Sequence, residues 1–144
     1  MRRAITYLQS ASRLASSTTP PTPITAVDIQ EIAGVVPDRV INNLARVVGI
    51  DVQDEDAMDT SDAPPPKGFD PVQTKVKELM REGYSATQIL MQLHDLVILH
   101  PSLDGKQKSQ CALVFAEADK ALCDGADEEL WILEVALRVY KLLS

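Results

Sequence analysis

The chain has 144 residues, a formal net charge of −7 and six scattered glycines. Hydrophobic residues make up 45% of it and aromatic residues only 4%, which favours helices over packed strands. This composition excludes a glycine-rich phosphate-binding loop, and the acidity excludes nucleic-acid binding through clustered lysine and arginine.

The first predicted element is a short helix over residues 3–15, where apolar residues recur at helical spacing. Residues 16–23, SSTTPPTP, read as a linker, because proline and hydroxyl-bearing residues favour turns. Thr25 and Asp28 then stand three apart, as in a weak capping box. We expect them to begin a second helix, which Gly34 closes.

A third helix is predicted from Pro37 to Gly49, because proline suits the first helical position. Residues 51–68, DVQDEDAMDTSDAPPPKG, break the pattern with high charge and three consecutive prolines. Such a segment buries too little surface to offset its ordering entropy, so we expect a disordered loop. An acidic segment that mimics phosphate or docks a basic partner is the alternative.

Two further helix starts follow the acidic segment. Asp70 and Pro71 fit an N-cap and a first helical residue. Gly83 ends that helix, and Ser85 with Gln88 has the spacing of a capping box for the next one. The chain is therefore predicted to be a set of antiparallel helices joined by short turns.

The helix over residues 86–99 is apolar on nearly all sides, which predicts that it is surrounded, as the central helix either of the bundle or of an interface. Asp104 and Gln107 cap the helix after it. That helix carries Cys111 and Cys123, which stand too far apart along it to form a disulfide. We expect both to be small buried residues of a reducing compartment.

Two apolar lines run along the predicted last helix, which follows Gly125 and starts with the acids Asp127, Glu128 and Glu129. One line consists of Leu130, Leu133, Leu137 and Tyr140, and the other of Trp131, Val135 and Leu142. Two apolar lines on one helix imply that two neighbours, either helices of the bundle or other chains, pack against it. Either the bundle itself encloses this helix, or the Trp131 line faces another protein chain, since tryptophan is a favoured interface anchor.

Several stretches resemble a known family. VDIQEIAGVVP, EGYSATQILMQLHD and AEADKALCDGADEEL, in this order, resemble the C-terminal collar domain of replication factor C small subunits, of the fourth-subunit type, which belong to the eukaryotic sliding-clamp loader. MRRAITYLQSA resembles the end of the AAA+ ATPase lid that precedes the collar. The resemblance implies an all-α fold: a lid remnant over residues 1–34, then a collar bundle of about five helices over residues 35–144.

The resemblance also implies a role. Collars of this family form a ring that holds the subunits together during ATP-dependent loading of the clamp onto primer–template DNA in the nucleus. The expected partners are other replication factor C subunits, contacted through Trp131, Val135 and Leu142. The family usually has a polar residue at the position of Trp131. Clamp and DNA would be reached only through the whole complex, and no apolar run is long enough for a membrane span.

ATP and magnesium belong to the full-length family. Arg2 falls on the family's sensor arginine, which contacts the terminal phosphate of ATP, although the Gly-Asp pair that precedes it in the family is missing here. The P-loop, the acidic magnesium motif and the arginine-finger segment are missing too. We therefore expect a fragment that neither binds nor hydrolyses ATP and holds no metal, because His94 and His100 lack ligand spacing.

Two other functions fit parts of the chain. Residues 1–27 contain no acid and include Arg2, Arg3 and Arg13, which is typical of a mitochondrial targeting segment. A free-standing helical adaptor would explain the capped helices and the two-sided last helix. An enzyme that uses Asp95 or Glu117 with a histidine has no supporting constellation of residues.

Overall fold

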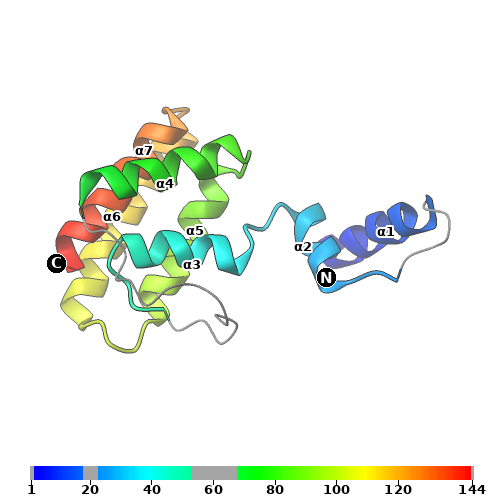
Figure 1. Ribbon diagram of the computed structural model, residues 1–144, viewed down its shortest axis with the longest axis horizontal. Coiled ribbons are helices and arrows are strands. Elements are labelled where there is room, and N and C mark those ends of the chain that lie inside the picture. The colour runs from blue at the N-terminus through cyan, green and yellow to red at the C-terminus, as the bar shows by residue number, and fades with distance from the viewer. Residues whose placement is uncertain (1, 18–22, 53–67, 144) are drawn as a thin grey trace. The chain divides into compact units, whose positions relative to one another are not determined.

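The computed structural model describes residues 2–17, 23–52 and 68–143. These residues form seven α-helices and no strand, as Figure 1 shows, which confirms the all-α prediction. The chain divides into two compact units, Met1–Pro37 and Asp38–Ser144. The acidic segment that we expect to be disordered lies, over residues 53–67, outside the described residues.

The first unit contains two helices that pack against each other, α1 (Arg2–Ser17) and α2 (Ala26–Ala33). Ala11 of α1 and Val36, which follows α2, are its buried apolar side chains. The larger apolar side chains of α1 are exposed: Ile5, Leu8 and Leu14. This unit therefore has little core of its own.

The predicted capping box at the start of α2 is confirmed. The Thr25 hydroxyl accepts a hydrogen bond from the Asp28 N–H at 3.3 Å, and Asp28 Oδ2 accepts one from the Thr25 N–H at 2.7 Å. The bond from the Thr25 backbone, and then that from its hydroxyl, lower the pKa of Asp28 because both favour the carboxylate. Gly34 ends the helix in the left-handed conformation, at φ 68°.

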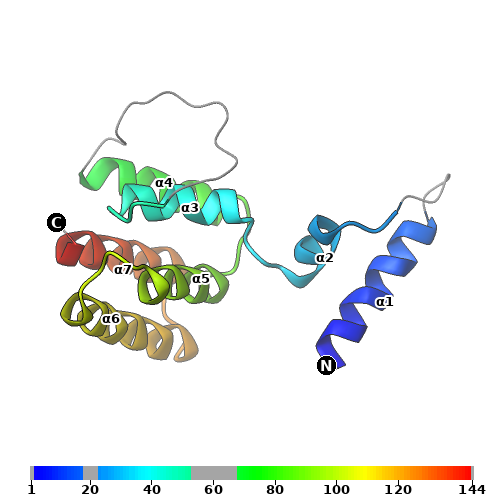
Figure 2. The ribbon, with the colours of Figure 1, turned by 90° about the horizontal axis from the view of Figure 1, so that it is seen from below.

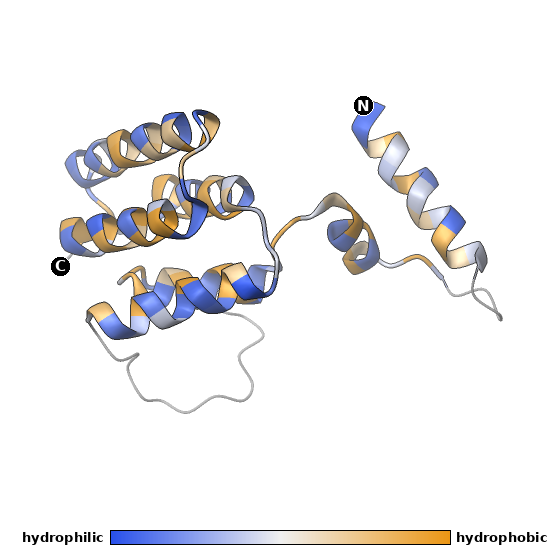
Figure 3. Cartoon of the chain, turned by 90° about the horizontal axis from the view of Figure 1, so that it is seen from above, coloured by the Kyte–Doolittle hydropathy of each residue, from blue (hydrophilic) through white to orange (hydrophobic). Residues whose placement is uncertain are grey.

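The second unit is a five-helix bundle with nearly all of the buried apolar side chains. Its helices are α3 (Asp38–Val47), α4 (Phe69–Arg81), α5 (Ala86–Leu99), α6 (Gly105–Cys123) and α7 (Glu128–Leu143). Figure 2 shows three layers: α3 with α4, then α5 with α7, then α6. In Figure 3, apolar and polar residues alternate around each of these helices, as amphipathic packing requires.

The helix starts differ from the sequence prediction at several places. α3 begins at Asp38, so Pro37 precedes the helix rather than being its first residue. α4 begins at Phe69, so Asp70 lies inside the helix rather than at its N-cap. Pro71 still falls in the first turn, where its missing N–H would have no helical acceptor. At α5, Ser85 takes the N-cap position but its side chain makes no capping bond. Gln88 instead donates to Gln92 Oε1 at 3.4 Å, so the predicted capping box is wrong.

α5 is buried on one face only. It contacts α3, α6 and α7, and its inward residues are Ala86, Ile89, Leu90, Leu93 and Val97. On the outward face, Met91 is 60% exposed and Leu99 is 79% exposed. Within the described residues three neighbours leave one side of α5 exposed, so the prediction that the bundle surrounds this helix is wrong. The alternative, a central position in an interface, stays a prediction.

The turns beside α6 and α7 follow the sequence closely. Gln107 Oε1 accepts a hydrogen bond from the Asp104 N–H at 3.2 Å, and Asp127 Oδ1 accepts one from the Leu130 N–H at 2.9 Å. Within α6, Cys111 is buried and Cys123 is exposed, and both are free thiols. The expectation that both cysteines are buried is thus wrong for Cys123, which lies on the outer side of the last turn.

Candidate subunit-interface surfaces

The position of α7 in the bundle explains its two apolar lines. The helix lies between α4 and α6 and also contacts α5, as Figure 2 shows. Its buried residues are Ile132, Val135, Ala136 and Val139. A helix with neighbours on both sides needs apolar residues on both sides. Of the two predicted lines only Val135 belongs to this buried set, while Leu130 is exposed and the other members are half-buried beside it.

Val135 was expected to contact another subunit, and the bundle corrects that expectation. Its side chain is 1% exposed and lies in the core of its own chain. A buried side chain in a packed core is not available to a second protein unless the bundle opens. The other two residues of that line, Trp131 and Leu142, are only half-buried and keep part of their surface in solvent.

An apolar groove follows the outer side of α7 next to Trp131. It is lined by Leu130, Trp131, Leu133, Glu134 and Leu137. Leu130, which the sequence placed in the other apolar line, is 65% exposed. The structure therefore brings Trp131 together with residues that the sequence assigned to the opposite line of the helix.

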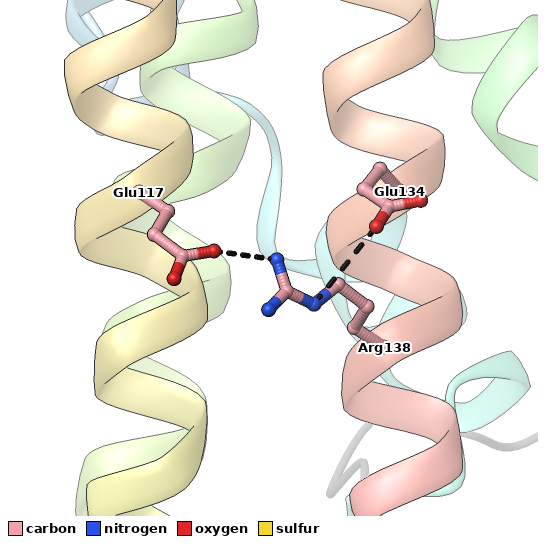
Figure 4. Close-up of polar contacts among 3 residues, drawn as sticks. All are labelled: Glu117, Glu134 and Arg138. Carbon is pink, nitrogen blue, oxygen red and sulfur yellow. Dashed lines mark hydrogen bonds and ion pairs between the residues drawn. The ribbon is translucent and has the colours of Figure 1, made fainter.

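Charged residues join α7 to α6 close to this groove. Arg138 Nη1 lies 2.6 Å from Glu117 Oε2 on α6, and its Nε lies 3.9 Å from Glu134 Oε1 (Figure 4). All three side chains are substantially exposed, so the pairs contribute at most about 1 kcal/mol. Glu134 also lines the groove, which is called the Trp131 surface from here on, so one carboxylate of this group belongs to that surface.

A second hollow lies between α3 and α5, where the sequence pointed to no site. Its apolar lining includes Ile41, Val52, Leu96, Leu99 and Pro101. Asp38, Asp51 and Asp95 also line it. Two segments about fifty residues apart form this hollow, so helical periodicity could not reveal it. The outward positions of Met91 and Leu99, eight residues apart on α5, were the available signal.

His100 connects the two walls of this hollow. Its Nε2 lies 2.8 Å from the carbonyl oxygen of Asp51, so Nε2–H donates there. Its Nδ1 is buried and has no hydrogen-bond partner among the described residues. The bond fixes the segment after α3 against the end of α5, which keeps the hollow in shape.

The remaining candidate residues do not form a catalytic or metal site within the described part of the chain. Arg2 is exposed at the start of α1. Asp95 Oδ1 lies 3.1 Å from His94 Nδ1, and Glu117 pairs with Arg138. No three His, Cys, Asp or Glu side chains there converge as metal ligands would. Helices long and apolar enough to cross a membrane are also absent from the described residues.

A helical bundle with exposed apolar surfaces on two sides is typical of modules that assemble with other chains. The profile of the replication factor C C-terminal domain matches residues 52–138, and the chain belongs to this family.

Individual relatives carry the same family name. Replication factor C subunit 4 of Arabidopsis thaliana is 41% identical over 137 residues, which cover 94% of this chain and 34% of the relative. Human replication factor C subunit 4 is 38% identical over 144 residues, covering 100% and 34%. Subunit 2 of Schizosaccharomyces pombe is 36% identical over 135 residues, covering 94% and 34%. The chain thus spans about a third of the length of these relatives.

Proposed function

We propose that this chain is the collar of a replication factor C subunit and holds that subunit in a hetero-oligomeric clamp loader. The family match over residues 52–138 is the observation that carries the proposal. The five-helix bundle supports the proposal, because it has a buried apolar core and still exposes large apolar side chains. Through such a complex, the chain takes part in ATP-dependent loading of the sliding clamp onto primer–template DNA in the nucleus.

We place one subunit contact at Trp131 and Leu142, with Leu130 added from the structure. Trp131 lines a shallow apolar groove together with the exposed Leu130. An aromatic side chain that a partner desolvates in such a groove contributes a large share of an interface's binding energy. Ring assembly also needs contact surfaces that are not self-complementary, and a surface on one side of the bundle meets that requirement.

The test is the affinity of the chain for the other purified replication factor C subunits. Trp131→Ala is expected to weaken binding by about 2 kcal/mol, or about thirtyfold, because a desolvated anchor is lost. Phe69→Ala is the matched control, since it removes an exposed aromatic side chain from α4. Equal affinities for wild type and Trp131→Ala, with helicity preserved, would remove Trp131 from the interface.

We also propose that the chain by itself does not hydrolyse ATP and needs no cofactor or metal. The assignment of Arg2 to the terminal phosphate of ATP rests on family resemblance and applies to the full-length subunit. A phosphate-release assay on the purified chain tests the first point. ATP hydrolysis that persists through further purification and is lost on Arg2→Ala would overturn the proposal that the chain by itself does not hydrolyse ATP.

The competing function is a free-standing helical adaptor, with residues 1–27 acting as a mitochondrial targeting segment. Size-exclusion chromatography with light scattering separates the two. The collar is expected to form a complex with other replication factor C subunits, whereas an adaptor would stay apart from them. A fusion of residues 1–27 to a fluorescent protein tests targeting, and mitochondrial import would favour the adaptor.

A further inference from the structure

We propose that the hollow between α3 and α5, here called the acidic groove, is a docking site for an apolar segment of another protein that carries lysine or arginine beside its apolar residues. The groove consists of Asp38, Ile41, Asp51, Val52, Asp95, Leu96, Leu99, His100 and Pro101, with the polar residues between them. The proposal concerns a different face from the Trp131 surface and does not depend on it.

The groove includes a strongly exposed apolar side chain. Leu99 is the most exposed large apolar side chain among the described residues, at 79%. It lies at the last residue of α5, and Leu96 and Ile41 line the groove beside it. Met91 continues the same outward face of α5 toward its N-terminus. Exposed apolar surface of this kind in a groove is typical of a protein contact.

The charge of the groove selects the partner. Three carboxylates and no lysine or arginine are found among the described residues that line it. The Arg46 guanidinium donates to the carbonyl oxygen of the lining residue Val52, at 3.4 Å from Nε and 3.3 Å from Nη2, and the three carboxylates of the lining outnumber this one positive charge. Like charges across an interface are strongly unfavourable, whereas complementary charges speed association and fix register. An apolar segment with basic flanks therefore fits, and an acidic segment or a nucleic acid does not.

The groove has a defined shape rather than being a gap between loose segments. The 2.8 Å contact between His100 Nε2 and the Asp51 carbonyl oxygen holds one wall to the other. The backbone after α3 is held by the bonds from Gly49 to Arg46 and from Ile50 to Ala45. A preformed groove of this kind avoids the entropy cost of ordering its walls when a partner binds.

The experiment titrates the full chain, labelled with ¹⁵N, with two synthetic helical peptides of the same leucine pattern. One peptide carries lysine beside the leucines and the other carries glutamate. The lysine peptide is expected to shift amide resonances around Asp51, Leu96 and Leu99 and to leave those of α6 unchanged. The glutamate peptide is expected not to bind.

Two triple variants that each remove three negative charges test whether the peptide binds the carboxylates of the groove or responds only to the net charge of the chain. The groove variant is Asp38→Asn, Asp51→Asn and Asp95→Asn, and the control is Asp119→Asn, Glu128→Gln and Glu129→Gln. The groove variant removes one acid from the first turn of a helix and the control removes two, so the control loses at least as much stabilisation from the helix dipole. The groove variant is expected to weaken lysine-peptide binding about tenfold, and the control to leave it unchanged.

Single variants complete the test. Leu99→Ser is expected to weaken lysine-peptide binding several-fold, and Trp131→Ala is expected to leave it unchanged, which keeps this result separate from that of the collar interface. Similar weakening by both triple variants, equal binding of the glutamate peptide, resonance shifts spread over all helices, or no binding of the lysine peptide would each overturn the proposal.

Discussion

At the scale of single residues, the two cysteines lie in the same helix but differ in solvent exposure, and therefore in thiol reactivity. Cys111 is fully buried between helices, and burial raises the pKa of its thiol because the thiolate would be poorly solvated. Cys123 lies at the exposed end of the same helix. The thiolate is the reactive form, so the two residues should differ sharply toward thiol reagents.

We expect one fast-reacting thiol in the native chain and a second one only after unfolding. Cys123→Ser should abolish the fast phase with a chromogenic disulfide reagent at neutral pH, and Cys111→Ser should leave it intact. Because the pKa of Cys111 is raised, its thiolate is scarce until the pH exceeds the ordinary range for cysteine. Two equally fast thiols in the native wild type would contradict this burial.

A pair of aspartate substitutions on α5 tests which face is buried. Leu93 is 1% exposed in the bundle core, so Leu93→Asp places an unpaired charge there and should cost more than about 4 kcal/mol, which is most of the stability of a marginally stable domain. Met91→Asp lies on the outward face and should change stability by less than about 0.5 kcal/mol. Thermal unfolding followed by circular dichroism measures both, and equal melting temperatures would refute the assigned orientation.

At the scale of helices, the backbone bonds after α6 show why the chain turns where it does. The Gly125 N–H donates to the carbonyl of Leu122, and the Ala126 N–H donates to that of Ala121. This pair of hydrogen bonds requires a residue in the left-handed conformation directly after the helix, and Gly125 is that residue, with φ 87°. The same arrangement ends α3 at Gly49, so glycine placement sets the lengths of these helices.

Substituting two glycines by alanine should therefore have opposite effects. Gly105, the first residue of α6, has no positive φ and its added methyl group meets no atom within 4 Å, so Gly105→Ala should stabilise the bundle by about 0.5 kcal/mol. Gly125→Ala has equal space but a positive φ and should destabilise it by about 1 kcal/mol. Urea unfolding measures both. Stabilisation by Gly125→Ala would mean that the turn tolerates a side chain, and destabilisation by Gly105→Ala would contradict the prediction for α6.

At the scale of the whole molecule, the two units have very different cores. Only Ala11 and Val36 are buried apolar residues within Met1–Pro37, whereas every other buried apolar side chain of the described chain lies in Asp38–Ser144. Buried apolar surface supplies most of the free energy of folding. Stability should therefore reside almost entirely in the five-helix bundle.

Removal of residues 1–34 tests this division. The shortened chain keeps α3–α7 together with Val35, Val36 and Pro37, and its cooperative unfolding transition should stay within about 4 °C of the wild type, which corresponds to about 1 kcal/mol or less. Hydrogen exchange in the whole chain should likewise be faster in α1 and α2 than in α6 and α7. A large drop in melting temperature would show that the first unit stabilises the second.

Local features were predictable because they depend on neighbouring residues. Glycines at helix ends, the Thr25–Asp28 box and the acids at the start of α7 act within one turn, and the structure confirms them. Side chains with a choice of partners were less predictable. Ser85 and Gln88 have the right spacing for a capping box, but Gln88 bonds Gln92 one turn further on.

The sequence by itself determined that the described part of the chain is built from helices and roughly where most of these helices begin and end. Only the tertiary structure decided that Val135 faces its own core, that Cys123 is exposed, and that α3 and α5 enclose an acidic groove. The reason is physical: helical periodicity arises from contacts three or four residues apart, whereas the cover on a helix face comes from segments far away in the chain.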